Sequence, residues 1–231
     1  MSKNLKFTKM KNEIKTSCYK GTRILFSDLA TYKRNLLNKM IEILSKEGFN
    51  EIMMPIIQMQ ETFGSKVGEE NNKMMYNFKD RGDRDLCLAP EYTAVIMQLS
   101  KEEFIFGKGL PIPDVKVFYI GECFRGENSQ KGRYRQFTQF GVEILNPTQD
   151  YTDYLIELSD ILTSLVTDLF EVNKEATRGL DYYKEGRGFE IACPELGSQK
   201  QICGGGSYDG GIGFAMGIDR LIILCNKKVI I

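Results

Sequence analysis

Alternating side chains in residues 117–145 constrain the fold of this chain more than any other stretch. Two segments alternate with a period of two, which is typical of β-strands, and a charged loop joins them. In the first segment one face carries the odd-numbered residues Val117, Tyr119, Gly121, Cys123, Arg125 and Glu127. In the second, the odd-numbered residues Gln139, Gly141 and Glu143 share a face. If the hairpin closes, one face presents four polar side chains together: Arg125, Glu127, Gln139 and Glu143.

The loop between the strands, residues 128–135, adds three basic side chains, Lys131, Arg133 and Arg135. A planar guanidinium holds phosphate or carboxylate oxygens through two parallel hydrogen bonds. A carboxylate such as Glu127 can accept hydrogen bonds from a base or an amino group. These residue types predict a site for a small anion beside an amine. The alternative is a solvated hairpin with ordinary salt bridges, because exposed charge is the default.

Three segments of this hairpin carry a family resemblance: Phe124-Arg125-x-Glu127, Gln130-Lys131-Gly132-Arg133-Tyr134-Arg135-Gln136-Phe137 and Gln139-Phe140-Gly141-Val142-Glu143. They resemble motif 2 of the class II aminoacyl-tRNA synthetases and, within that class, the histidyl-tRNA synthetases. The resemblance implies an α+β fold, with a mainly antiparallel sheet flanked by helices. It also favours the anion site over the solvated hairpin.

Composition limits the kinds of protein that this chain can form. At 231 residues, 42% of them hydrophobic, the chain is long enough for one sizeable domain. Lys plus Arg and Asp plus Glu both number 31, so a net charge of zero gives no overall attraction to nucleic acid. Six cysteines without CxxC pairs, and no histidine, argue against a zinc site and favour reduced thiols. With no signal peptide and no apolar run of membrane-spanning length, we expect a soluble cytoplasmic domain.

The sequence predicts a polar, lysine-rich N-terminal arm at residues 1–19 and a synthetase-like catalytic domain at residues 20–231. Apolar residues at helical spacing predict a helix over residues 27–47, which Gly48 can end. A strand over residues 49–57 follows, and Pro55 inside it indicates an edge or interface position. This pair resembles class II motif 1, which implies a homodimer through residues 28–57. The alternative is an ordinary helix–strand pair.

A strand at residues 86–88 leads into the turn Ala89-Pro90-Glu91-Tyr92-Thr93-Ala94. This turn resembles the Arg-Pro-Glu-Gly-Thr-Ala turn of the family, whose Glu and Thr bind the amino group of the substrate. Glu91 and Thr93 match that pattern, whereas Ala89 and Tyr92 depart from it. A tyrosine in place of glycine can narrow the amino-acid pocket. Glu91 is also a carboxylate of the kind that the helix dipole favours in a first turn.

Residues 150–173 predict a long amphipathic helix with a stripe of core leucines at 155, 158, 162, 165 and 169. The next segment, Arg178-Gly179-Leu180-Asp181-Tyr182-Tyr183, resembles the histidine-specific signature of the histidyl enzymes. The resemblance implies that Arg178 contacts the reacting carboxylate and phosphate, and that Tyr183 lines the side-chain pocket. Residues 189–191 continue this segment as a strand.

A glycine run at residues 204–210 is by itself a weak signal, equally typical of a flexible turn. The segment after it, Gly213-Phe214-Ala215-Met216-Gly217-Ile218-Asp219-Arg220-Leu221, resembles class II motif 3. Small residues let backbone approach a nucleotide, and Arg220 at the helix start can pair with phosphates. The alternative for Arg220 is a surface arginine on a terminal helix.

Two parts of the family's enzymes have no counterpart in this sequence. Residues 146–177 leave room for one helix between motif 2 and the arginine signature, but not for the usual helical insertion domain. The chain also ends directly after the motif 3 helix, without the carboxy-terminal anticodon-binding domain. Because these parts hold tRNA, we do not expect this chain alone to charge tRNA.

The resemblance therefore implies an enzyme that activates an amino acid with ATP and Mg²⁺, for an acceptor other than tRNA. Histidine is the expected amino acid, and Mg²⁺ would bridge the phosphates without a protein ligand being assigned to it. The catalytic residues implied are Arg125, Arg178 and Arg220. The residues implied for ATP are Arg125, Glu127, Arg133, Tyr134, Phe137 and Arg220. Those implied for the amino acid are Glu91, Thr93, Gln139, Glu143, Tyr182 and Tyr183.

Two other classes of function remain open from the sequence. A paralog of histidyl-tRNA synthetase serves as the histidine-binding regulatory subunit of ATP phosphoribosyltransferase, and its catalytic subunit would then be the protein partner. A regulator needs histidine contacts but not the ATP-binding arginines, which this chain retains, so the enzyme is favoured. A structural dimerisation subunit would need neither set of residues.

Overall fold

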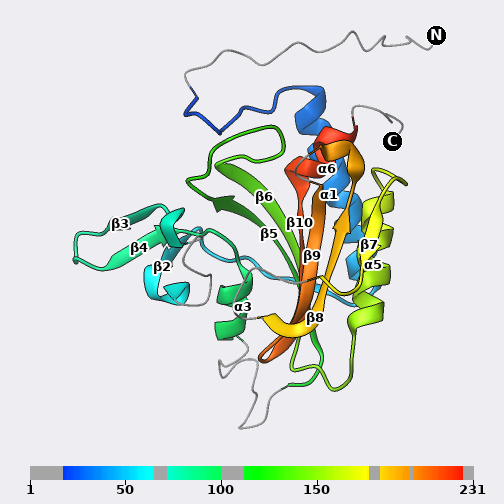
Figure 1. Ribbon diagram of the computed structural model, residues 1–231. Helices are drawn as coiled ribbons and strands as arrows, with labels where there is room; N and C mark the ends of the chain where they lie inside the picture. The colour runs from blue at the N-terminus through cyan, green and yellow to red at the C-terminus, as the bar shows by residue number, and fades with distance from the viewer. Residues whose placement is uncertain (1–17, 65–71, 100–111, 177–182, 198–199, 226–231) are drawn as a thin grey trace, which may run out of the picture.

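The structure is a computed structural model that describes residues 18–64, 72–99, 112–176, 183–197 and 200–225 (Figure 1). Within these residues seven strands form one large sheet, and three further strands form a small one. The order in the large sheet is β1 (Asn50–Glu51), β5 (Val115–Phe124), β6 (Gln136–Leu145), β10 (Gly211–Gly217), β9 (Gln201–Tyr208), β8 (Tyr183–Ala192) and β7 (Glu171–Asn173). Only the β1–β5 pair in this sheet is parallel. The predicted α+β fold with a mainly antiparallel sheet is confirmed.

The predicted hairpin is formed by β5 and β6, paired from Val115 opposite Leu145 to Phe124 opposite Gln136. In this register Gly121 lies opposite Gln139, so the odd-numbered residues of both strands share a face, as the alternation predicted.

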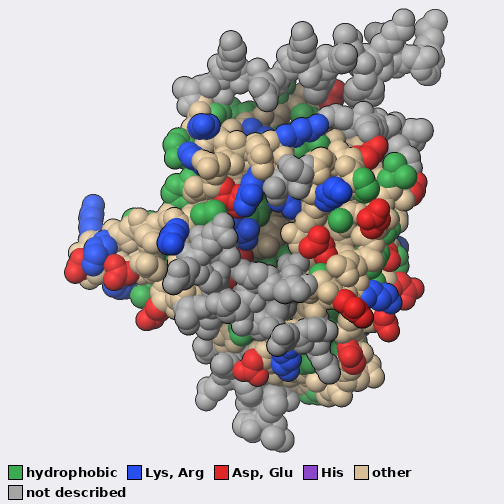
Figure 2. Space-filling model, viewed as in Figure 1, with side chains coloured by type: hydrophobic (Ala, Val, Ile, Leu, Met, Phe, Trp, Pro, Cys, Tyr) green, Lys and Arg blue, Asp and Glu red, His purple; other side chains and the backbone are tan. Residues whose placement is uncertain are grey.

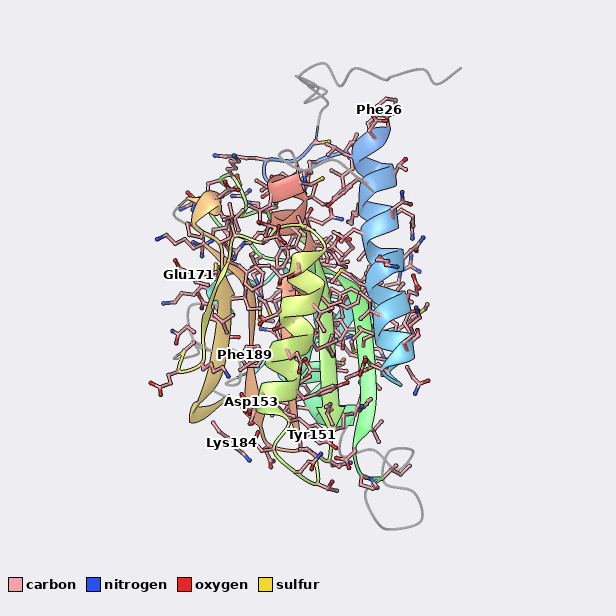
Figure 3. The ribbon with its side chains drawn as sticks, turned by 90° about the vertical axis from the view of Figure 1, so that its right-hand side faces the viewer. Phe26, Tyr151, Asp153, Glu171, Lys184 and Phe189 are labelled. Carbon is pink, nitrogen blue, oxygen red and sulfur yellow. The ribbon has the colours of Figure 1, made fainter. Side chains whose placement is uncertain are left out.

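Helices cover the face of the large sheet that carries the even-numbered residues of this hairpin. These are α1 (Asp28–Lys46), α5 (Thr152–Ser164) and α6 (Ile218–Cys225), and Figure 3 shows α1 and α5 packed along the same side of the strands. Their apolar residues form one buried core with the sheet. In that core the rings of Phe118 and Phe140 stack with centroids 5.8 Å apart. This layer fixes the strands so that their other face can form the site.

On the opposite face lie α3 (Thr93–Leu99) and the small sheet, ordered β2 (Ile57–Met59), β4 (Asp85–Leu88) and β3 (Asn77–Lys79). A second buried cluster joins α3 and β4 to odd-numbered residues of β5, among them Val117, Tyr119 and Cys123. Short 3₁₀ turns at Gln60–Thr62 and Pro194–Leu196 complete the described elements. None of the described helices has the length and apolarity required to cross a bilayer.

Helix α1 ends at Lys46, and Gly48, the residue predicted to end it, follows with a φ of 82°. The amide of Gly48 donates to Ser45 O at 3.2 Å, and the amide of Phe49 donates to Leu44 O at 3.0 Å. These bonds satisfy carbonyls that the last helical turn leaves open.

Two predicted elements are wrong in extent. The strand over residues 49–57 breaks into β1 and β2, because residues 50–51 pair with β5 in the large sheet whereas residues 57–59 pair with β4 in the small sheet. Pro55 therefore lies in the connection between them. The helix over residues 150–173 ends at Ser164, and residues 171–173 pair with β8 instead. Leu169, assigned to the core, is 59% exposed.

Candidate functional site

The odd-numbered face of the hairpin continues across the large sheet as a surface of small residues. The register places Gly213 of β10 opposite Glu143 of β6 and Gly206 of β9. Residues 204–208 of the glycine run thus form a strand, and Asp209 and Gly210 form the turn into β10. The alternation along the strand divides its residues between two faces. A Cβ at Gly205 would lie 2.6 Å from Phe189 Cζ, so Gly205 is required by core packing. Gly204 and Gly206 face the site, where only a small residue leaves room for a ligand.

Three guanidinium groups converge at one end of this surface: Arg125 after β5, Arg133 in the loop and Arg220 on α6. Burial lowers the pKa of Arg220 from its ordinary value, and the positive charges of Arg125 and Arg133 lower it further. Arg220 nevertheless keeps its charge at neutral pH, because arginine does not lose its proton in proteins. Figure 2 shows basic side chains around a hollow in the middle of this face. Mutual repulsion of this kind favours an anion between the arginines.

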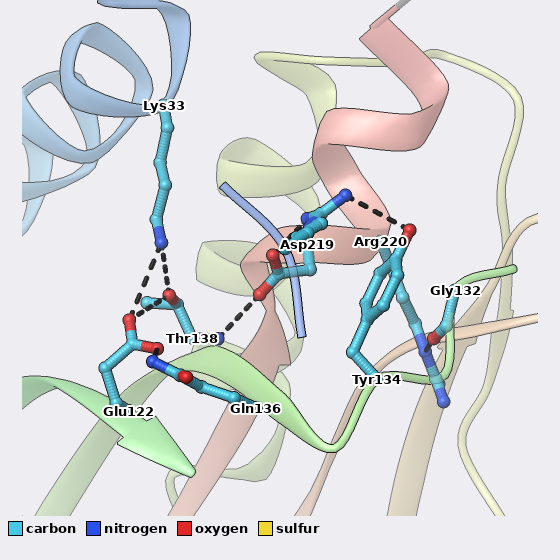
Figure 4. A network of polar contacts seen from close by, with 9 residues as sticks. Lys33, Glu122, Gly132, Tyr134, Gln136, Thr138, Asp219 and Arg220 are labelled. Carbon is cyan, nitrogen blue, oxygen red and sulfur yellow. Dashed lines mark hydrogen bonds and ion pairs between the residues drawn. The ribbon is translucent and has the colours of Figure 1, made fainter. Parts of the chain in front are cut away.

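Backbone carbonyls hold two of these arginines in place. Arg220 donates from Nε to Gly132 O at 2.9 Å, which connects α6 to the hairpin loop (Figure 4), and from a terminal nitrogen to Gln201 O at 2.6 Å. Arg125 donates from Nε to Pro90 O at 2.9 Å. The bond from Arg125 to Pro90 O connects the guanidinium cluster to the turn that carries Glu91.

The other residues predicted for ATP lie around the same loop. Glu127 is buried, 8% exposed, and forms an ion pair with Arg133. The guanidinium of Arg125 lies 5.2 Å from the centre of the Phe137 ring. Tyr134 lies beneath another arginine, Arg23, whose guanidinium carbon is 4.1 Å from the ring centre. The structure brings these predicted residues together, but it pairs Glu127 with a neighbouring cation.

Residues predicted for the amino acid lie at the start of α3 and on β6; we call this part of the site the amino-acid end. Both carboxylate oxygens of Glu91 accept backbone hydrogen bonds, from Thr93 N at 2.7 Å and Ala94 N at 3.0 Å, so Glu91 caps α3. The hydroxyl of Thr93 donates to Glu143 Oε1 at 3.3 Å, and the hydroxyl of Tyr208 donates to Glu143 Oε2 at 2.8 Å. Predicted residues 91, 93 and 143 therefore lie side by side.

Glu143 is 1% exposed, and its burial raises the pKa of this carboxyl to about 8. Hydrogen bonds from Tyr208 and Thr93 lower the pKa, whereas the charge of Glu91 raises it. Desolvation is the largest of these causes, so the carboxyl holds a proton at neutral pH. A protonated Glu143 can donate one hydrogen bond as well as accept them.

Tyr92, one of the two departures from the family turn, is 1% exposed and packs on Gly121, where a Cβ would overlap its ring. Its hydroxyl donates to Glu122 O at 3.1 Å. Tyr119 packs in the same way on Gly141 and donates to Gln139 Oε1 at 3.3 Å. Two tyrosine rings, 5.3 Å apart, therefore fill the space beside Gln139.

Three predicted residues cannot be placed as side chains. Arg178 and Tyr182 lie outside the described residues, and only the backbone of Tyr183 is described. In the register Tyr183 of β8 lies opposite Tyr208 of β9. Strand β10 lies between β9 and β6, and the side chain of Tyr208 reaches Glu143 across it.

Sequence reasoning assigned no role to Tyr208, Asp219 or Arg23. Tyr208 follows Gly204 and Gly206 at a spacing of two, which is the signal that could have placed it on the site face. Asp219 accepts a hydrogen bond from Thr138 N at 2.6 Å and pairs with Arg23 (Figure 4). The sequence holds no comparable signal for these contacts, since they join residues far apart in the chain.

Comparisons with known proteins bear on the family and the fold of this chain. A family model described as histidyl-tRNA synthetase matches residues 21–174. The histidine–tRNA ligase of Desulfitobacterium hafniense is 28% identical over 310 residues, which cover 88% of this chain and 72% of the relative. Since 310 exceeds the 231 residues of this chain, the relative holds segments inside the aligned region that have no counterpart here.

Solved structures with the same fold include the apo histidyl-tRNA synthetase of S. aureus, with a TM-score of 0.73 and 24% identity. That match covers 91% of this chain and 70% of the other. An ATP phosphoribosyltransferase regulatory subunit/histidyl-tRNA synthetase from Bacillus halodurans has a TM-score of 0.73 and 16% identity. It covers 94% of this chain and 85% of the other. At these identities the structural matches show the fold alone.

Proposed function

The chain belongs to the histidyl-tRNA synthetase family, and on that basis we propose that it activates an amino acid with ATP, forming an aminoacyl-adenylate and pyrophosphate. Histidine is the proposed amino acid. The observation that carries the proposal is the convergence of Arg125, Arg133 and Arg220 on a glycine surface. A triphosphate supplies the negative charge that such a cluster accommodates.

In the proposed reaction a carboxylate oxygen of the amino acid attacks the α-phosphorus of ATP. The bond from that phosphorus to its bridging oxygen breaks, and pyrophosphate leaves with the electron pair. Catalysis of this kind depends on positioning and charge stabilisation. Arg125, Arg178 and Arg220 would stabilise the charge that develops on the phosphate oxygens. The hydrogen bond from Arg125 Nε to Pro90 O would hold this guanidinium between the two reacting groups.

At the nucleotide end, Glu127 would accept a hydrogen bond from the adenine amino group, and Tyr134 and Phe137 would flank the base. Arg133 would then break its ion pair with Glu127 and bind a phosphate group of ATP. Mg²⁺ would be carried on the phosphates and would neutralise part of their charge. The described residues contain no group of three or more His, Cys, Asp or Glu able to hold a metal ion.

At the amino-acid end, Glu91, Thr93 and Gln139 would hold the amino group. Glu143, with Tyr182 and Tyr183 on the signature segment, would recognise the imidazole ring. A protonated Glu143 can donate to one ring nitrogen and a tyrosine hydroxyl can donate or accept at the other. Buried hydrogen-bonding partners of this kind discriminate against isosteres that lack the ring nitrogens.

The proposed acceptor of the activated amino acid is a small molecule, a peptide or a protein, and not tRNA. Two observations support this part of the proposal. The aligned relative contains internal segments that this chain lacks. The chain also has a net charge of zero, whereas binding of a nucleic acid rests largely on positive charge.

We also propose that the enzyme is a homodimer, with an interface around residues 28–57 that extends onto the small sheet. Apolar side chains are exposed along this part of the surface, namely Met53, Ile56, Ile57, Met59 and Phe78. Exposed apolar residues that cluster on adjacent elements indicate an interface.

A second candidate function is the histidine-binding regulatory subunit of ATP phosphoribosyltransferase. The Glu127–Arg133 ion pair favours it, because it engages the carboxylate that would otherwise accept a hydrogen bond from adenine. A regulator would bind histidine at Glu143 without exchanging pyrophosphate, and the catalytic subunit would be its partner.

Pyrophosphate exchange, measured with each of the twenty amino acids, tests the proposal. We expect ATP-dependent exchange with histidine above all others, and its loss in Arg125→Ala. Exchange that is faster with another amino acid would refute histidine as the substrate. Binding of histidine without any exchange would favour the regulatory subunit.

A further inference from the structure

The N-terminal strap, defined here as residues 18–23, lies against the hairpin loop of residues 128–135. The amide of Arg135 donates to Gly21 O at 2.8 Å. The side chain of Arg135 donates to Tyr19 Oη at 2.7 Å, and its guanidinium lies 5.1 Å from the centre of that ring. Gly21 has a φ of 88°, and a Cβ there would lie 2.7 Å from Arg135 Cγ. The close contact therefore depends on glycine at this position.

Arg23, the last residue of the strap, connects the loop to α6. Its guanidinium lies 4.1 Å above the centre of the Tyr134 ring and donates to Tyr134 Oη at 3.1 Å. A second guanidinium nitrogen pairs with Asp219. The other oxygen of Asp219 accepts the amide of Thr138 at 2.6 Å, as Figure 4 shows. Arg23 thus joins the loop to helix α6, and Asp219 joins α6 to strand β6.

The loop is therefore held from two sides. On one side Arg220 donates to Gly132 O at 2.9 Å, and on the other the strap holds Arg135 and Tyr134. Between these anchors lies Arg133, one of the three converging guanidiniums. A loop with a free end on the strap side would let Arg133 and Tyr134 take many conformations, and binding a nucleotide would then cost the entropy of ordering them.

We infer that Arg23 is a positioning residue of the nucleotide site, which orders Tyr134 and the hairpin loop before ATP binds. This inference rests on the proposed function for the identity of the ligand. Arg23 acts through Tyr134 and Asp219, which engage its guanidinium on both sides. Its loss would weaken the site for ATP and leave the amino-acid end, built from α3 and Glu143, as it is.

The test compares three variants in the full chain. Arg23→Met removes the charge and keeps the length of the side chain, and Arg23→Lys restores a charge without the planar group. Arg84→Met is the matched control, because Arg84 pairs with Asp80 at the tip of the small sheet, on a different element from the loop. Pyrophosphate exchange gives the KM for ATP and for histidine separately. Amide hydrogen exchange without substrates reports how well ordered the loop of residues 128–135 is.

We expect Arg23→Met to raise the KM for ATP about tenfold, the change that corresponds to ~1.4 kcal/mol, with an unchanged KM for histidine. Amides of the loop, Arg135 among them, should exchange faster. Arg23→Lys should recover part of both effects, and Arg84→Met should show neither.

Unchanged loop exchange in Arg23→Met would overturn the inference, and so would equal rises in the KM for ATP and for histidine. If Arg23→Met does not fold, Tyr134→Leu removes the ring on which Arg23 packs and should loosen the same loop amides. A wild-type protein that binds no ATP in calorimetry would refute the proposed function and the role in nucleotide binding together. The loop exchange would still decide whether Arg23 orders the loop.

Discussion

Replacement of Glu143 by glutamine should make the stability of this protein less sensitive to pH. Glutamine keeps the shape of a protonated glutamate, its carbonyl can accept the bond from Tyr208, and its amide can donate to Thr93 Oγ1. The two hydrogen bonds that Glu143 makes in the buried site thus retain partners. What the substitution removes is a group that can ionise.

The sign of the effect follows from the raised pKa. The pKa of Glu143 is about 8 in the folded chain, against an ordinary value of 4.5. Between these two values the folded state holds a proton that the unfolded state has lost. Stability therefore falls as pH rises through this window. Integrated from pH 5 to pH 8, the loss is about 3.5 kcal/mol for the wild type, and Glu143→Gln lacks it.

The assay is urea unfolding of both proteins at several pH values from 5 to 8. The unfolding free energy of Glu143→Gln minus that of the wild type should increase by about 3.5 kcal/mol as the pH rises from 5 to 8. Glu42→Gln is the matched control, because Glu42 is exposed and its neighbours Lys46 and Lys39 lower its pKa to about 2. Glu42 is ionised in both states across this range, so its variant should run parallel to the wild type. A Glu143→Gln curve that also runs parallel would refute the argument from desolvation.

Three further predictions concern the phosphate end, the tyrosine departure and the dimer. Arg125→Ala should weaken ATP binding in calorimetry by about 2 kcal/mol, the scale of a charge-assisted contact; unchanged affinity would contradict it. Tyr92→Phe should lose about 1 kcal/mol of stability, because the bond to Glu122 O is removed while the ring stays on Gly121; wild-type stability in urea unfolding would contradict it. Ile57→Lys, at an exposed apolar position, should give monomers by light scattering, unlike Ile161→Lys on α5; a monomeric wild type would refute the dimer.

The hairpin part of the candidate site could be predicted from the sequence, because its residues are close together in the chain. The period of two fixes which side chains share a face as soon as two strands pair, and the pairing of Gly121 with Gln139 follows that alternation. The partner of Glu127 could not be predicted in the same way. Several basic residues in the loop could reach this carboxylate, and only the folded loop selects Arg133.

The rest depends on contacts between residues far apart in the chain. The proton on Glu143 depends on burial, which raises the pKa of this carboxyl, and the hydroxyl bonded to it comes from Tyr208, 65 residues away. The predicted strand over residues 49–57 is interrupted around Pro55 because residues 50–51 pair with the large sheet and residues 57–59 pair with the small sheet. Local periodicity contains neither fact, since each is decided by tertiary packing. The helix over residues 150–173 was overextended for the same reason, because pairing with β8 takes its last residues.

The two ends of the site differ in how their polar groups are balanced. At the amino-acid end the carboxyl groups already have partners: Glu91 caps α3 and Glu143 holds two hydroxyls. At the phosphate end the charges of Arg125 and Arg133 act against that of Arg220. An anion between the guanidiniums would relieve this repulsion. An amino acid, by contrast, would have to replace hydrogen bonds that Glu91 and Glu143 already make. The free energy available from binding is therefore concentrated at the phosphate end, where the proposed reaction develops its charge.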